Sequence, residues 1–261
     1  MKKKNQDNLC KGYVSIDNTI IIEPNYDAPI DGKLAKIISA HTRLIFSNYV
    51  DNDKKYNVYM KGKYYDTYDF ENFKNLKSLY DKPIDGKLPQ QIKSLILGWS
   101  FNQSVENLPT SLNCITFGHE FNQMVDNLPN TLKYLTFGFK FNQRADNLPN
   151  TIEYLSFGFE FNQKVEDLPN GILSVVFGEL FSYSLNCLPT SVKFISIKNR
   201  YTNSDTERLP KSLEEITFVI GSNDWKKYYR EYKLHYEEHS TIEKYNLENI
   251  SWKFCRKINT Y

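Results

Sequence analysis

The sequence predicts a β-rich solenoid, a stack of short coils whose strands lie side by side in one parallel sheet. Three observations predict it. A Leu-Pro pair recurs every 20 residues with one step of 21, a phenylalanine keeps the same period, and most periods contain a short apolar stretch that ends in glycine. Self-similarity at a fixed short period is the signature of a repeat architecture. The leucines of these pairs are Leu88, Leu108, Leu128, Leu148, Leu168, Leu188 and Leu209.

Each period is expected to contain one strand. In the unit that begins at Phe121, residues 132–137 read L-x-x-L-x-F, a short strand pattern between Pro129 and Gly138. A proline in every period would interrupt long helices, and about 20 residues leave room only for extended or short 3₁₀ backbone opposite the strand. Arrays of helical repeats are therefore disfavoured.

A single unit cannot fold alone. Burying its six large apolar side chains contributes roughly 9–18 kcal/mol, whereas ordering 20 backbone residues costs roughly 20–40 kcal/mol. Stacking is therefore required, and neighbouring coils should share backbone hydrogen bonds and one continuous core. The expected product is a curved, quasi-one-dimensional body whose two ends need caps.

Units such as FNQMVDNLPNTLKYLTFGFK, residues 121–140, resemble the FNIP repeat, a family found in social amoebae and in giant viruses that infect amoebae. The resemblance covers about residues 84–219. The units are also similar to leucine-rich repeats, which implies a leucine-rich-repeat-like horseshoe. The asparagine usual in those repeats is absent from its position. Instead, a separate column could hydrogen-bond backbone, with an interruption at Ser182; it comprises Asn102, Asn122, Asn142 and Asn162.

The N-terminal third, residues 1–83, is interpreted as degenerate repeats or a cap that precedes a regular array at residues 84–221. The string Pro-Ile-Asp-Gly-Lys-Leu occurs at residues 29–34 and again at residues 83–88. The expected strands are Ile20–Ile22, Leu44–Phe46 and Leu76–Leu79, and the tyrosine-rich stretch Tyr56–Tyr68 is expected to form an irregular or inserted coil.

Residues 222–261 are expected to form a C-terminal helical cap. Five aromatic residues from Trp225 to Tyr236 recur at helical spacing on one side. Asn223 or Asp224 could serve as the N-cap of this helix. Apolar residues farther along are expected to continue the packing over the last coil; these are Leu247, Ile250, Trp252 and Phe254.

Composition argues against several classes of protein. The 261 residues carry 33 Lys and Arg against 31 Asp and Glu, a formal net charge of +2, so no overall field attracts nucleic acid or an anionic membrane. The longest aliphatic run, Ile20–Ile22, is too short to span a bilayer. The expected location is the cytoplasm, or the host cytoplasm if the protein is viral. Four scattered cysteines predict reduced, mostly buried thiols; they are Cys10, Cys114, Cys187 and Cys255.

One string has the form of a metal-binding catalytic motif. His235, Glu238 and His239 satisfy H-x-x-E-H, the pattern of some zinc peptidases. Such enzymes need a further carboxylate ligand well downstream, and only 22 residues follow. A zinc hydrolase is therefore a remote alternative, and zinc bound without catalysis by the two histidines and Cys255 is a second. The sequence predicts neither an enzyme nor a cofactor.

The expected function is protein–protein interaction, because FNIP repeats are regarded as interaction modules. Outward positions of the strands and the position after each glycine vary between repeats, whereas the inward positions recur. The residues expected to bind the partner are Trp99, His119, Tyr134, Phe139, Tyr154, Phe159 and Phe194. In the alternative interpretation, Phe139 and Phe159 only stack on each other or pack inward.

A second functional alternative comes from the same resemblance. Some FNIP proteins carry an F-box, which would make this protein a ubiquitin-ligase substrate adaptor whose N-terminal third is a diverged F-box. The identity of the protein partner and the oligomeric state stay open. Binding to nucleic acid is not expected, because the mixed charges provide no basic groove.

Overall fold

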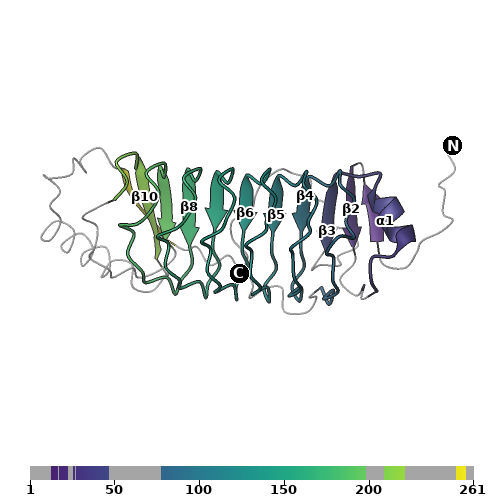
Figure 1. The fold of residues 1–261 in the computed structure, drawn as a ribbon. Helices are drawn as coiled ribbons and strands as arrows, with labels where there is room; N and C mark the ends of the chain where they lie inside the picture. The colour runs from purple at the N-terminus through teal and green to yellow at the C-terminus, as the bar shows by residue number, and fades with distance from the viewer. Residues whose placement is uncertain are drawn as a thin grey trace, which may run out of the picture.

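The computed structural model describes residues 13–16, 18–22, 26, 28–46, 78–197, 209–220 and 251–256. Within these ranges, eleven strands form one sheet whose order follows the chain from β1 to β11, and the body is elongated (Figure 1). The strands are β1 Tyr13–Ile16, β2 Thr19–Ile22, β3 Arg43–Phe46, β4 Ser94–Ile96, β5 Cys114–Thr116, β6 Tyr134–Thr136, β7 Tyr154–Ser156, β8 Ser174–Phe177, β9 Phe194–Ile197, β10 Glu215–Ile220 and β11 Ser251–Arg256.

Every neighbouring pair from β2 to β11 is parallel, and only β1 and β2 are antiparallel. The predicted solenoid with a parallel sheet is therefore confirmed, and it has about eight turns. The expected strands at Ile20–Ile22 and Leu44–Phe46 are confirmed by β2 and β3. The curvature of a horseshoe stays a prediction.

The Leu-Pro turn sets the start of each strand. In one coil, the amide of Leu132 donates to the carbonyl of Pro129 at 3.0 Å, which closes the turn. The Thr131 hydroxyl then donates to the carbonyl of Leu112 in the preceding coil at 2.6 Å, and the amide of Tyr134 donates to the carbonyl of Asn113 at 3.1 Å. Because the Leu-Pro turn is hydrogen-bonded to the preceding coil, the register between neighbouring strands is set before the strand begins.

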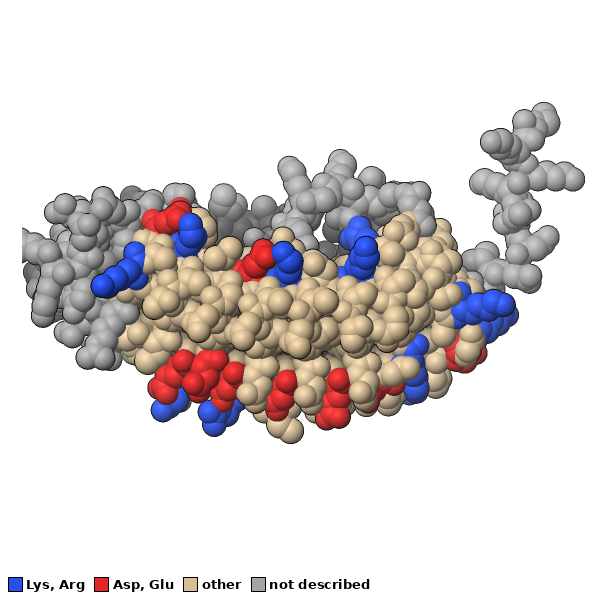
Figure 2. Space-filling model, turned by 45° about the horizontal axis from the view of Figure 1, so that its top comes forward, with Lys and Arg blue, Asp and Glu red and all other residues tan. Residues whose placement is uncertain are grey.

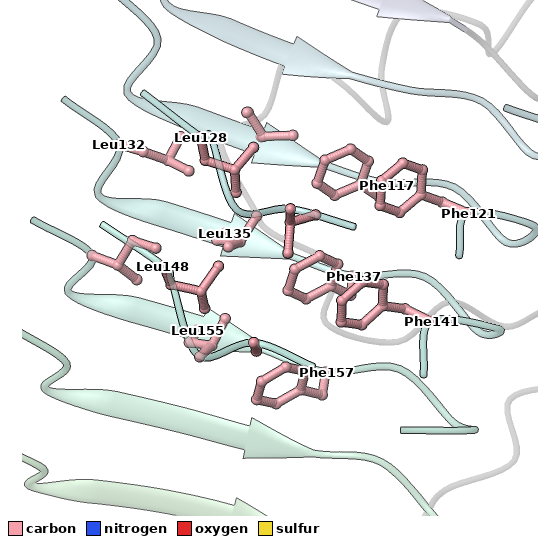
Figure 3. Close-up of a cluster of buried hydrophobic side chains, with 14 of the residues drawn as sticks. Phe117, Phe121, Leu128, Leu132, Leu135, Phe137, Phe141, Leu148, Leu155 and Phe157 are labelled. Carbon is pink, nitrogen blue, oxygen red and sulfur yellow. The ribbon is translucent and has the colours of Figure 1, made fainter. Parts of the chain in front are cut away.

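The core consists of stacked columns of phenylalanine and of leucine, isoleucine or valine between the strands and the returning chain (Figure 3). Phe141 is fully buried. Its ring centroid lies 3.7 Å from that of Phe137, four residues earlier in the chain, and 6.1 Å from those of Phe121 and Phe161 in the neighbouring coils. The columns continue from coil to coil, so the core is one body along the whole array. This explains why the inward positions recur while the outward positions vary.

The predicted asparagine column forms a ladder. The side-chain oxygen of Asn122 accepts the backbone amide of Asn142 at 2.9 Å, and that of Asn142 accepts the amide of Asn162 at 2.9 Å. The ladder begins with Asp81, whose carboxylate accepts the amide of Asn102 at 2.9 Å. At its other end the amide of Ser182 donates to the side chain of Asn162, and serine has no amide side chain with which to continue the ladder.

Replacing Asn142 with alanine is expected to lower the unfolding free energy by about 1–3 kcal/mol. The backbone amide of Asn162 and the side-chain amide of Gln163 both donate to the side-chain oxygen of Asn142 and would lose this acceptor. Asn142→Asp should recover part of this loss, since it keeps an acceptor oxygen, as Asp81 does. Urea denaturation followed by circular dichroism measures both. The exposed Asn147→Ala is the control, expected within about 0.5 kcal/mol of the wild type. Equal losses for Asn142→Ala and Asn147→Ala would contradict a structural ladder.

The glycine after each strand allows the coils to approach closely. A Cβ atom added to Gly138 would lie 1.8 Å from the carbonyl oxygen of Gly118, and one added to Gly158 would lie 1.7 Å from that of Gly138. No side chain fits there. The glycine column is therefore a requirement of stacking, and it places the residues that follow it in a tightly spaced row.

The expected strand at Leu76–Leu79 is wrong for the two of its residues that the structure describes. Residues 78 and 79 are not in a strand, and β3 pairs directly with β4. Tyr80 is buried instead, with its ring 4.4 Å from that of Phe46, and Asp81 begins the asparagine ladder. Tyr80 and Asp81 thus occupy the positions that a Phe-Asn pair occupies in the later coils. That pair lies in the part of the coil that leads back toward the next strand, so residues 78 and 79 precede it without forming a strand. Residues 56–68 lie outside the described ranges.

The repeated string Pro-Ile-Asp-Gly-Lys-Leu has two conformations. In the first copy Asp31 caps the helix α1, Gly32–Ile38, by accepting the amide of Leu34 at 2.8 Å. In the second copy Gly86 has a φ of 63°, and the chain turns without forming a helix. Pro89 comes directly after this copy, and proline both lacks an amide hydrogen and disfavours helical backbone in the residue before it. The residues after the string therefore decide its conformation.

The expected C-terminal helical cap stays a prediction, because the structure describes only residues 251–256 of the segment 222–261. Residues 251–256 form β11, which continues the parallel sheet beside β10. The first four residues of β11, SWKF, alternate polar and apolar with a period of two, which favours a strand, and β10 offers an edge with which to pair. The expected helix from Trp225 to Tyr236 lies outside the described residues. Within the described ranges, no helix is long and apolar enough to cross a membrane.

Candidate protein-binding surface

The first residues of successive strands form a row on the outer face of the sheet, which we call the strand-face row. Tyr134 pairs in register with Cys114 on one side and with Tyr154 on the other. The next residue of each strand points inward and is buried, as Leu135 is. The exposed fractions are 40% for Tyr134 and 42% for Phe194, high values for large rings. The row comprises Ser94, Cys114, Tyr134, Tyr154, Ser174, Phe194 and Glu215.

The residues after the glycines form a second row, a stack of rings that we call the aromatic ladder. The ring centroids of Trp99 and His119 are 3.9 Å apart, those of His119 and Phe139 are 4.7 Å apart, and those of Phe139 and Phe159 are 4.5 Å apart. The rings are within 11° of parallel. Such spacing matches that of neighbouring strands, so the ladder is a direct product of the close approach at the glycine column.

Backbone hydrogen bonds hold the ladder in register. The amide of Lys140 donates to the carbonyl of His119 at 2.9 Å, and the amide of Glu160 donates to that of Phe139 at 2.9 Å. The four rings are half-buried. The stacking of Phe139 on Phe159 is therefore established. Whether a partner binds the aromatic ladder stays a prediction.

The two rows lie at different points along the strands. Tyr134 is the first residue of β6, whereas Phe139 lies three residues beyond its last residue, Thr136. The rows therefore run parallel to each other at opposite ends of the strands. Of the seven residues expected to bind, Tyr134, Tyr154 and Phe194 belong to the strand-face row, and the other four make up the aromatic ladder.

A small polar cluster lies beside the ladder. The Nδ1 atom of His119 is 2.8 Å from Oε1 of Glu120, and Nζ of Lys140 is 2.6 Å from Oε2 of the same carboxylate. Burial raises the pKa of Glu120, but the hydrogen bonds from Lys140 and His119 and their charges outweigh it, so this pKa lies below its ordinary value of 4.5. The hydrogen bond to Glu120 raises the pKa of Lys140.

Because the pKa of Glu120 is depressed in the folded protein, the stability it contributes is present above pH 4.5 and is lost as the pH falls through the folded-state pKa. Glu120→Gln should lower the unfolding free energy at pH 7 by at most about 1 kcal/mol, and the difference should shrink as the pH falls below 4.5 through the folded-state pKa. Urea denaturation at a series of pH values measures this. Exposed Glu106→Gln is the control. A Glu120→Gln difference that persists unchanged at low pH would contradict the ion pair as its cause.

Sequence reasoning missed three exposed apolar side chains in the coil that contains β8. They are Leu173, Leu180 and Tyr183. A signal was available, because each departs from the polar residue found at the same position in the two preceding coils. Lys133 and Glu153 correspond to Leu173, for example. The apolar exposure is therefore concentrated toward the C-terminal part of the array.

Charges on the surface are mixed. On the face in Figure 2, charged side chains lie along two long edges, acidic groups predominate along one of them, and uncharged residues fill the band between. Several charges form pairs between neighbouring coils, such as Lys133 with Glu153 at 2.7 Å and Lys193 with Glu214 at 2.9 Å. The hydrogen bond to Glu153 raises the pKa of Lys133. The described residues on this face form no continuous basic stripe.

The next feature is the set of side chains in the described ranges that could bind a metal ion. There, no three His, Cys, Asp or Glu side chains are grouped so that they could hold a metal ion. The motif from His235 to His239 lies outside those ranges. Cys114 is a half-buried cysteine in the strand-face row. Cys187 is exposed, so the expectation of a buried thiol is wrong there, because this position lies in a surface turn.

A search of the solved structures finds a likeness to one described as "The crystal structure of CroV588 a novel circular LRR protein structure". The two are 24% identical with a TM-score of 0.42, and the match covers 82% of this chain and 38% of that one. This chain therefore spans well under half of the length of that protein. No curated protein matches. The model of the FNIP repeat matches residues 80–120, 104–140 and 121–160. Residues 80–160 of this chain are accordingly similar to FNIP repeats.

Proposed function

We propose that this protein is a non-enzymatic interaction module, a solenoid scaffold that presents its strand-face row and aromatic ladder to a host or viral protein in the cytoplasm. The observation that carries the proposal is the exposure of Tyr134 and Phe194, at 40% and 42%, on a face whose backbone the core holds in place. Stacking does not require a large ring at these positions, since Ser94 and Ser174 occupy the same row.

The chemistry of the row supports a protein partner. Exposed aromatic rings contribute large contact areas at small entropic cost, and they are enriched in the few residues that dominate binding energy. Ion pairs adjoin the row, because Lys133 directly precedes Tyr134 and Lys193 directly precedes Phe194. An aromatic centre with a charged rim is typical of protein interfaces. A stack of coils provides many such positions along one extended surface.

Proximity labelling in the host cell tests the proposal with a double variant, Tyr134→Ser with Phe194→Ser. Serine is chosen because this row already accommodates it. The matched control is Met124→Ser, which removes a side chain that is 72% exposed and lies ten residues, half a coil, away from Tyr134. The double variant should lose its labelled partner, whereas the control should keep it.

Unchanged labelling by the double variant would overturn the proposal. The labelled proteins also address the adaptor alternative, because a diverged F-box in the N-terminal third predicts a Skp1-type linker among them. Labelling of that linker by both variants would indicate an adaptor that uses a different part of the chain.

A further inference from the structure

The Leu-Pro turn before β8 contains the one Asn-Gly pair of the sequence, Asn170 followed by Gly171. The two preceding turns have an Asn-Thr pair at the same positions, residues 130–131 and 150–151. All three asparagines are exposed. The three turns therefore differ in the residue that follows the asparagine, and not in how far solvent reaches the asparagine itself.

In the Asn-Thr turns, the threonine side chain anchors the residue after the asparagine to the preceding coil. The Thr131 hydroxyl donates to the carbonyl of Leu112 at 2.6 Å, and the Thr151 hydroxyl donates to that of Leu132 at 2.8 Å. Threonine is also branched at Cβ, which crowds its own backbone nitrogen. Gly171 has neither the hydroxyl anchor nor the branched side chain, so its backbone nitrogen is the more accessible one.

Hydrogen bonding does not hold the Asn-Gly pair in place either. Within the described ranges, the backbone amide of Gly171 donates to no acceptor, and the side chain of Asn170 makes no hydrogen bond. The turn is closed only by the amide of Ile172, which donates to the carbonyl of Pro169 at 3.3 Å. Because glycine also has the widest choice of backbone angles, the carboxamide of Asn170 and the nitrogen of Gly171 can approach each other.

We propose that Asn170 is a site of spontaneous covalent modification, at which its carboxamide is converted into a carboxylate through a succinimide. The backbone nitrogen of Gly171 attacks Cγ of Asn170. The N–Cγ bond forms, the Cγ–Nδ2 bond breaks, and the amide proton leaves with the nitrogen as ammonia. Water then opens the ring: cleavage of the N–Cγ bond gives aspartate, and cleavage at the main-chain carbonyl carbon gives isoaspartate. The reaction consumes water, releases ammonia and needs no oxidant or reductant.

The modification changes the turn that sets the start of β8. Isoaspartate adds a methylene group to the main chain, and both products add a negative charge near the exposed Asp167. Just beyond the turn, the amides of Leu173 and Ser174 donate to the carbonyl of Glu153 in the preceding coil at 2.9 and 3.1 Å. A longer turn moves these amides away from their acceptor, so the isoaspartate form should pair less firmly with β7.

Peptide mass spectrometry of the folded full chain, incubated at neutral pH, tests the proposal. Aspartate and isoaspartate should accumulate at position 170, while Asn130 and Asn150 serve as controls within the same molecule and should stay unmodified. Asn170→Gln should abolish the modification there, because the longer side chain closes its ring far more slowly. Thr151→Gly should transfer the modification to Asn150. Gly171→Thr is unsuitable as a control, since a Cβ there would lie 1.9 Å from the carbonyl oxygen of Asn150.

Three results would overturn the proposal. Equal modification at Asn150 and Asn170 would show that the glycine does not select the site, and so would an unmodified Asn150 in Thr151→Gly. Modification of Asn170 only in the urea-unfolded chain, and not in the folded one, would show that the turn protects it. Incubated wild type should also lose stability in urea denaturation relative to incubated Asn170→Gln. Equal stability after full modification would contradict the stated effect on β8.

Discussion

Gly138→Ala is expected to destabilise the protein by about 3 kcal/mol or more, because the added methyl has no space. Its Cβ would lie 1.8 Å from the carbonyl oxygen and 2.4 Å from the carbonyl carbon of Gly118, and 3.0 Å from the amide nitrogen of His119. All three are backbone atoms, so no side chain can move aside. The clash could be relieved only if the two coils moved apart, which would weaken both the hydrogen bonds of the sheet and the stacking in the aromatic ladder.

Gly32→Ala is the matched control for this prediction. A Cβ at Gly32 has no atom within 4 Å, and alanine is a better helix former than glycine at this end of α1. The control should therefore be neutral or slightly stabilising. Urea denaturation of both variants provides the comparison. If Gly138→Ala is as stable as Gly32→Ala, the close approach of the coils is not what the structure shows.

Phe141→Ala should lower the unfolding free energy by about 3–5 kcal/mol, the cost of a large cavity in a core. Phe141 is fully buried, and its ring packs 3.7 Å from that of Phe137 and between the rings of Phe121 and Phe161. The loss extends to both neighbouring coils, because each contributes one wall of the cavity.

The control is Phe139→Ala, the same substitution two residues away in the aromatic ladder. Phe139 is half-buried, and alanine there removes its stacking on His119 and Phe159 without opening a closed cavity. We expect about 1–2 kcal/mol, well below the loss at Phe141. Thermal and urea denaturation measure both. A larger loss at Phe139 than at Phe141 would contradict the division between core and ladder.

The middle of the array could be predicted from the sequence because each coil repeats the environment of the one before it. A period of 20 residues with Leu-Pro and Gly brackets predicts both the strand and its register, as β5, β6 and β7 show. The asparagine ladder could be anticipated for the same reason: a polar residue that recurs at a half-buried position must bond to its own column.

The ends of the array could not be predicted, because there the conformation depends on the neighbours of a segment as well as on its own residue pattern. The string at residues 29–34 and 83–88 is identical, yet one copy leads into α1 and the other turns at Gly86. Residues 251–256 pair with β10 because a sheet edge is available there, which a single-sequence pattern does not reveal. Both outcomes depend on the neighbours of the segment, either along the chain or across the sheet.

The residues of the candidate surface could be predicted from the sequence, but the relative positions of the two rows could not. Alternation along each strand identified Tyr134 and Phe194 as outward residues, and both are exposed. The separation of the two rows required the strand boundaries, since Thr136 ends β6 before Phe139 is reached. The exposure of Leu173 was missed because a repeat pattern highlights residues that recur, whereas this one departs from its column.

The strand-face row is the central functional claim, and site-specific photo-cross-linking tests it most directly. Benzoylphenylalanine placed at position 134 or 194 puts the reactive group on an exposed ring of the row, and at position 124 it lies on a side chain 72% exposed, half a coil away. In host cells, positions 134 and 194 should each cross-link to the same partner protein, and position 124 should not. Equal cross-linking to that partner from position 124, or none from the row, would contradict the claim.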